Sequence, residues 1–353
     1  PKGITIMKKT LAALIVSAVA ASAANAAVVY DNEGTKVELG GSLRLIMEKA
    51  DKKEYDRANH STKKANSALR NAGSRFGVKV KHNLDNDFYA LGNLELRFDD
   101  TTSRDKFGGA YAKRAYVGLG SQSVGEIKFG RQLTIADDLS QANDYEYGFI
   151  PKGDYIPTSG TGVVRYDYKG IEGLQLSANY NFGQKNDEKG KALDPAIKNA
   201  FALGALYTAG DLDARFAYGH TNLETNATYK HRVDGFLASL GYKFGDFTLT
   251  GDFGYAHVKE NDAKTNKFYV SPGFAYQATP MSQVYGNYLY ERVKGESDKE
   301  KTHGFLLGAD YKLHKQVVLF VEGKYVTTKE YVNDSYDGKT KDRAIGVGMR
   351  VFF

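Results

Sequence analysis

Residues 133–161 collect the acidic side chains with the clearest functional potential in this sequence. The segment carries five acids against a single lysine, Lys152, and it holds two of the six prolines of the chain. Carboxylates gathered in this way attract cations and set up a local field where they face water. Four of them are the candidate functional acids: Asp137, Asp138, Asp144 and Glu146.

The same segment also carries apolar side chains, which a loop pointing into solvent would not need. These are Leu133, Ile135, Leu139, Phe149 and Ile150. One interpretation is a loop that folds back into an enclosed, water-filled space, with its apolar side on the wall and its acids facing the opening. The other interpretation is an ordinary long surface loop, and the residues of the segment leave both open.

Catalytic and metal-binding chemistry has little support in the sequence. Seven histidines are scattered singly, and none forms a pair with metal-ligand spacing. The chain has no cysteine, so thiolate sites and disulfides are excluded. The stretch GLGSQSVG at 118–125 lacks the spacing of a nucleotide-binding glycine motif. We therefore predict no catalytic residue, no metal and no cofactor.

The elements that must position these side chains are strands. In RAIGVGMRVFF (343–353) apolar residues alternate with small or charged ones, and LQLSANYNF (174–182), RFGVKVK (75–81) and VRYDYKG (164–170) repeat the pattern. A period of two indicates a β-strand. A soluble sandwich also alternates in this way. Tyrosine and phenylalanine at the ends of the apolar faces instead favour a membrane barrel with aromatic girdles.

The number and spacing of the strands predict the architecture. The alternating stretches give about 16 strands, at about 20 residues for each strand and its connection, which is sufficient to cross a membrane. Long polar connections, predicted at 49–73, 183–199, 294–302 and 329–341, alternate with short ones. A barrel of that size encloses an aqueous channel. The predicted fold is all-β: a transmembrane antiparallel β-barrel of about 16 strands, with short periplasmic turns and long extracellular loops. On the first interpretation of residues 133–161 given above, the third loop is folded into the lumen.

The front of the chain has the features of a targeting segment. Residues 7–26, MKKTLAALIVSAVAASAANA, combine two lysines, a short apolar stretch and a small-residue cleavage site, which indicate a secretory signal peptide. Residues 1–6 have no role that we can assign, and 27–353 form a single predicted barrel domain. The net charge of +6 is spread over interspersed acids and bases. We interpret it as a mixed solvated surface, and we predict no nucleic-acid partner.

Several short motifs, in order along the strand pattern, resemble a known family. They are AVVYDNEGTKVELGGSLRL at 27–45, SRFGVK at 74–79, GRQ at 130–132 and the terminal Phe353. Together they resemble the trimeric general porins of Gram-negative outer membranes and are similar to the major porins of the Haemophilus–Pasteurella group. The resemblance implies a passive channel in the outer membrane, with residues 133–161 as the loop that narrows it.

The resemblance also implies a basic wall opposite that loop. Arg75 and Arg131 match positions of the family's wall arginines. Ser42 stands where the family has a basic residue, and Arg44, two residues further on the same face, is expected to replace it. Arg165 and Lys79 join the predicted wall because alternation places them on the water-facing side.

The function implied is passive diffusion of small hydrophilic solutes and ions through a water-filled channel, with a transverse field at the narrowest point. The implied partners are two further copies in a homotrimer and outer-membrane lipids, including lipopolysaccharide. Phe353 is the implied assembly signal. Two alternatives stay open: an outer-membrane barrel enzyme that hydrolyses lipid or peptide, and an adhesin or structural barrel.

Overall fold

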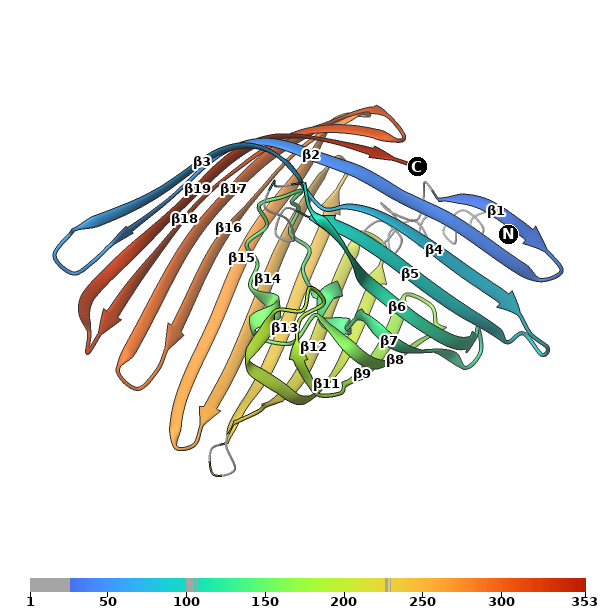
Figure 1. The fold of residues 1–353 in the computed structure, drawn as a ribbon, viewed down its shortest axis with the longest axis horizontal. Coiled ribbons are helices and arrows are strands. Elements are labelled where there is room, and N and C mark those ends of the chain that lie inside the picture. The colour runs from blue at the N-terminus through green and yellow to red at the C-terminus, as the bar shows by residue number, and fades with distance from the viewer. Residues whose placement is uncertain (1–25, 100–104, 106, 226–227, 229) are drawn as a thin grey trace.

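The computed structural model describes residues 26–353, except 100–104, 106, 226–227 and 229. The predicted upstream segment 1–6 and the signal peptide up to residue 25 lie outside the described residues. Within the described part, nineteen strands form one antiparallel sheet. The sheet closes because β19 (Ser335–Phe352), the last strand, pairs with β2 (Thr35–Tyr55). Figure 1 shows the resulting barrel.

Three of the nineteen strands are continuations of others, so the barrel has sixteen strands around its circumference. β3 (Ser61–Asn71) and β4 (Ser74–Asn83) pair with successive halves of β2. β9 (Leu174–Asn181) and β10 (Gln184–Asn186) lie end to end along β11 (Ala192–Ala209). β1 (Ala27–Asn32) pairs with the start of β2, in line with β19. The predicted fold class is confirmed.

The other strands follow one another around the wall in chain order. They are β5 (Tyr89–Asp99), β6 (Gly109–Ser121), β7 (Gly125–Leu133), β8 (Ser159–Ile171), β12 (Leu212–Leu223), β13 (His231–Phe244), β14 (Phe247–Glu260), β15 (Ala263–Thr279), β16 (Ser282–Lys294), β17 (Asp298–His314) and β18 (Val317–Val332). Two short 3-10 helices, η1 (Ile135–Leu139) and η2 (Lys152–Asp154), lie between β7 and β8. No helix in the described part of the chain is long and apolar enough to cross a membrane.

The barrel wall is apolar on its outside and polar on its inside. On β19, Ile345 and Val347 are at least half exposed, while Ala344, Gly346 and Gly348, which alternate with them, are buried. On β9 the buried residues are instead polar: Gln175, Ser177, Asn179 and Asn181. A surface of this kind is stable where hydrocarbon meets the outside and water meets the inside. The predicted alternation is therefore confirmed.

The two ends of the barrel differ. At one end, here named the turn rim, strands are joined by two to five residues, as at 33–34, 84–88, 245–246 and 315–316. The opposite end, the hairpin rim, carries strands that extend well beyond the apolar band. There the predicted long loops are wrong: only residues 56–60 separate β2 from β3, and only residues 333–334 separate β18 from β19. Polar strands persist because paired neighbours satisfy each other's backbone groups.

Candidate functional site

Residues 134–158, between β7 and β8, run through the inside of the barrel (Figure 1). The apolar side chains of this lumen loop are buried against strands β11 to β13, as Ile135, Leu139 and Ile156 show. The wall makes room with small residues: a Cβ on Gly235 would lie 2.2 Å from the backbone oxygen of Tyr155. The prediction of a loop folded into the lumen is confirmed.

A buried carboxylate holds the tip of the lumen loop. Glu322 on β18 is fully buried, and its two oxygens accept backbone hydrogen bonds from Tyr145, Glu146 and Tyr147 at 2.7, 2.8 and 2.6 Å. The Tyr285 hydroxyl donates a fourth hydrogen bond at 2.6 Å. A charged acceptor with all donors in place is a strong anchor in a low-dielectric setting.

A second carboxylate holds the middle of the loop. Asp252 on β14 accepts hydrogen bonds from the Ser140 hydroxyl at 2.5 Å and from the Gln141 backbone N–H at 2.9 Å. The Asn287 side chain on β16 donates to the Asn143 carbonyl at 2.8 Å. The loop is thus fixed at several points across the barrel, so its path is set by the wall.

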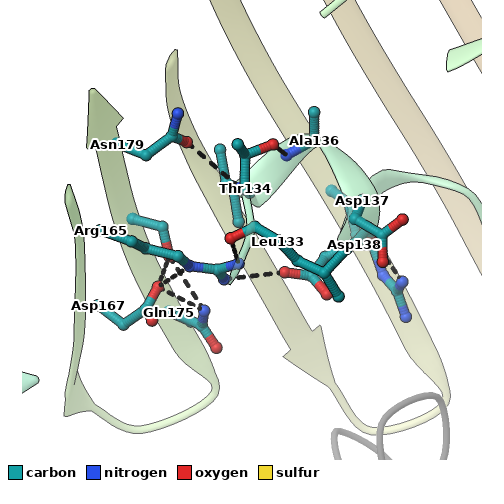
Figure 2. Close-up of polar contacts among 12 residues, drawn as sticks. Leu133, Thr134, Ala136, Asp137, Asp138, Arg165, Asp167, Gln175 and Asn179 are labelled. Atoms are coloured by element: carbon teal, nitrogen blue, oxygen red, sulfur yellow. Dashed lines mark hydrogen bonds and ion pairs between the residues drawn. The ribbon is translucent and has the colours of Figure 1, made fainter. Parts of the chain in front are cut away.

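The guanidinium group of Arg165 binds the start of the lumen loop, as Figure 2 shows. The Arg165 guanidinium on β8 lies between Asp138 of the loop, at 3.0 Å, and Asp167 of its own strand, at 3.1 Å. It also donates to the Leu133 carbonyl at 3.3 Å. Arg165, predicted on the water-facing side of the wall, and Asp138, predicted as a loop acid, thus form a direct ion pair.

Two other predicted acids have different environments. The Asp137 carboxylate lies 3.4 Å from the Lys152 ammonium of the same loop. Asp144 is exposed, and it forms no ion pair with any residue that the structure describes. Surrounding protein and the neighbouring Glu322 carboxylate together raise the pKa of Asp144 to about 6.

Several arginine side chains lie close together on the part of the wall that faces the lumen loop. Arg350 on β19 stands directly across from Arg44 on β2, and Arg75 on β4 stands directly across from Arg97 on β5. Like charges in direct cross-strand pairs destabilise a sheet. Arg44, Arg75 and Arg350 have no carboxylate within 4.0 Å among the described residues. Such a cluster is stable only with water or anions at its surface.

This arginine cluster and the loop tip enclose a cavity of about 290 Å³. Glu146 of the loop faces it and binds Arg70 of β3 at 2.8 Å, and Arg350 donates to the Tyr145 carbonyl at 2.6 Å. The lining contains seven cations and one acid: Arg44, Arg70, Arg75, Arg97, Lys113, Lys189, Arg350 and Glu146.

The structure places two predicted wall residues elsewhere. Arg131 follows the β-bulge at Gly130, and its guanidinium donates to the Ala112 carbonyl at 2.6 Å. Lys79 is exposed on β4, further toward the turn rim. Neither lines the cavity. Arg97 and Arg350 do line it and were missed, although alternation with Leu94 and Val351, which are exposed, could have placed them on the inside.

Comparisons with known proteins agree with this geometry. The family model for Gram-negative porins matches residues 10–344. A major outer membrane protein of Pasteurella multocida (strain Pm70) is 31% identical, over 98% of this chain and 100% of that protein. Among solved structures, OmpT of Vibrio cholerae superposes with a TM-score of 0.71 at 19% identity, covering 92% of this chain and 99% of that one. An anion-selective porin from Comamonas acidovorans gives 0.64 at 17%, covering 90% and 100%. The chain belongs to the Gram-negative porin family, whose members are outer-membrane channels for passive diffusion.

Proposed function

We propose that the arginine cluster and the tip of the lumen loop form the narrowest part of the channel, and that this part favours anions. The observation that carries the proposal is the cavity lined by seven cations and one acid. Three of its arginines lack a carboxylate partner among the described residues, so their charge acts on passing solutes. The solutes are small and hydrophilic, since the lining offers ionic and hydrogen-bonding groups.

The exposed acids of the loop add a transverse component to this field. Asp144 lies on the loop, and the arginines lie on the wall across from it. Separated charges in a narrow, low-dielectric-walled gap produce a field that orients dipolar solutes. The Debye length at physiological salt, about 8 Å, leaves a field across so small a gap only partly screened. Apolar solutes pass poorly, because they would displace water that this field holds.

Charge selectivity in a planar bilayer tests the proposal. In a KCl gradient the wild-type channel is expected to show a reversal potential of the sign for anion preference. Arg75→Ala should move it toward cations, because the cavity loses an unpaired charge. Arg131→Ala is the matched control, since it removes the same charge from a site outside the cavity. Equal effects of the two substitutions, or none from Arg75→Ala, would overturn the assignment.

We also propose that the protein is a channel without enzymatic activity. No group of three histidine, aspartate or glutamate side chains that could hold a metal occurs in the described residues. The buried lumen carboxylates Glu322 and Asp252 accept hydrogen bonds from the loop and are not available to a substrate. Ohmic single-channel steps without hydrolysis of lipid or peptide substrates are the expected result. Hydrolysis of these substrates by protein that forms no channels would favour the alternative of a barrel enzyme.

The proposed assembly is a homotrimer in the outer membrane, with the hairpin rim outside and lipids, including lipopolysaccharide, around it. One solved structure of Vibrio cholerae OmpT is described as a trimer form, with a TM-score of 0.69. Phe353 lies at the barrel seam, where its backbone pairs with Gly41 and its ring stacks on Phe76 at 6.4 Å. We assign it the role of assembly signal. Mass measurement in detergent checks the oligomer.

A further inference from the structure

A second segment reaches over the lumen beside the lumen loop. Residues 184–196, here named the crossing hairpin, consist of β10, a turn at 187–191 and the first part of β11. This part of β11 runs past Leu223, the last residue of the neighbouring strand β12. The tip of the hairpin crosses to β6, where Glu188 forms an ion pair with Lys113. The crossing hairpin therefore joins parts of the wall that β7 and β8 separate.

The register of the wall strands shows what the crossing hairpin adds to the arginine cluster. Arg75 on β4 lies directly opposite Arg97 on β5, and Arg97 lies directly opposite Tyr111 on β6. Along this row the wall changes from arginine to tyrosine at β6. The Lys189 ammonium of the hairpin lies 5.4 Å from the centre of the Tyr111 ring. A charge from another segment thus takes the next place in the row, and it lines the same cavity.

The turn of the crossing hairpin is fixed by its own hydrogen bonds. One oxygen of the Asp187 carboxylate accepts the backbone N–H groups of Lys189 and Lys191, both at 2.9 Å. The Asp187 carbonyl accepts the Gly190 N–H at 3.0 Å. Gly190 has a φ of +83°, which glycine adopts without strain. Because the turn is rigid in itself, the place of Lys189 depends on where the tip of the hairpin is held.

An ion pair holds this tip against β6. The Lys113 ammonium donates to the Glu188 carboxylate, and both side chains are mostly buried. Such pairs hold structure better than exposed ones, because water and salt screen them less. The base of the hairpin is held on β8, where the Thr161 N–H donates to the Gln184 side chain at 3.2 Å. Loss of the ion pair would therefore release the tip while the base stays attached.

We propose that Lys189 is a specificity-determining residue of the channel, and that Glu188 is the positioning residue that brings it to the arginine cluster. Passing anions then meet a cation that is carried by a separate hairpin rather than by the wall. Part of the anion preference therefore depends on the contact between the crossing hairpin and β6. The inference rests on the proposed function, because it concerns the same cavity.

Reversal potentials in a KCl gradient test the role of Lys189. Lys189→Gln should lower the anion-to-cation permeability ratio by about two- to fourfold, the effect of one unit charge a few ångströms from an ion in water. Lys191→Gln is the matched control, since it removes the same charge from an exposed position of the same turn, outside the cavity lining. It should leave the ratio unchanged. Equal shifts in the two variants, or no shift in Lys189→Gln, would overturn the proposal.

A double-mutant cycle tests the positioning role of Glu188. In a Glu188→Gln background the tip is released, so Lys189→Gln should have little further effect on the permeability ratio. If Glu188 contributed only its charge, Lys189→Gln would shift the ratio equally in both backgrounds. That result would remove the positioning role.

Chemical labelling of the inserted channel gives a second readout that does not depend on comparing separately folded variants. The chain has no cysteine, so Lys189→Cys carries a single thiol. A cationic methanethiosulfonate reagent should restore the wild-type reversal potential, and an anionic one should move it further toward cations. Lys191→Cys should show neither change. Labelled Lys189→Cys channels with an unaltered potential would refute the proposal.

The two proposals for this cavity can fail separately. If Arg75→Ala shifts the reversal potential and the Lys189 variants do not, this inference fails and the proposed function stands. If Arg75→Ala has no effect, the proposed function fails, whichever result the Lys189 variants give.

Discussion

Glu322→Gln should release the tip of the lumen loop while leaving the barrel wall intact. One carboxylate oxygen accepts the Tyr145 N–H and the Tyr285 hydroxyl, and the other accepts the N–H groups of Glu146 and Tyr147. Glutamine replaces one of these oxygens with an NH₂ group, so two donors lose their acceptor. Hydrogen bonds to charged groups contribute about 1.5–3 kcal/mol each, which gives a loss of about 3–6 kcal/mol.

Hydrogen exchange of the protein in nanodiscs measures this loss at the amides that make the bonds. A loss of that size corresponds to a faster exchange at residues 145–147 by about a hundredfold to ten-thousandfold. Peptides around Ser140 should keep their protection, because Asp252 still holds them. Single-channel records should show added open-state noise.

Glu330→Gln is the matched control for this substitution. It removes the same charge from the same strand and face, at an exposed position. It should leave both exchange and noise unchanged. Unaltered exchange at 145–147 in Glu322→Gln, or equal acceleration in Glu330→Gln, would refute the role of Glu322 as the anchor.

Three further predictions concern charge, stability and assembly. Because the pKa of Asp144 is raised to about 6, acidification from pH 7.5 to 4.5 should protonate its carboxylate and strengthen the preference for anions. Asp144→Asn should show, at every pH, the reversal potential that the wild type shows at pH 4.5. Arg165→Gln leaves Asp138 without its cation and leaves Asp167 with Lys128 alone, so it should lower the free energy of unfolding in urea by about 3 kcal/mol. Arg343→Gln breaks an exposed pair with Asp51 and should leave the free energy of unfolding close to that of the wild type, so equal losses in the two variants would contradict the difference in burial. Deleting Phe353 should reduce the fraction of heat-modifiable barrel without changing the conductance of inserted molecules, and normal insertion would remove its assembly role.

The barrel could be predicted from the sequence because each membrane-spanning strand has hydrocarbon on one face and water on the other. Apolar and polar side chains must therefore alternate along it. Ile345 and Val347 face outward as the pattern of β19 requires. The pattern fails at the hairpin rim, where both faces of a strand meet water. Residues 49–55 and 61–71 are mostly polar, with no continuous apolar face, and yet pair as β2 and β3. Without an apolar face, such hairpins cannot be distinguished from loops by composition.

The site was only partly predictable. The alternation of side chains along a strand predicts whether a residue faces the lumen or the outside, but it does not predict which residue it pairs with. Arg165 faces inward as predicted, but its ion pair with Asp138 depends on where the loop crosses the lumen. Arg350 gains its neighbour Arg44 only when the first and last long strands meet at the seam. Arg131 is displaced by a bulge after Gly130, which a strict period of two does not anticipate.

The placement of the acids explains how one loop can both narrow the channel and set its charge. Wall carboxylates on β14 and β18, Asp252 and Glu322, are used to hold backbone and hydroxyl donors of the loop. Both are buried, so their charge reaches passing solutes weakly. No loop carboxylate pairs with Arg44, Arg75 or Arg350 in the described residues, so these charges stay available. An acidic loop therefore yields a cationic cavity, because the wall acids that secure it are hydrogen-bonded to the loop, whereas Arg44, Arg75 and Arg350 have no carboxylate partner among the described residues.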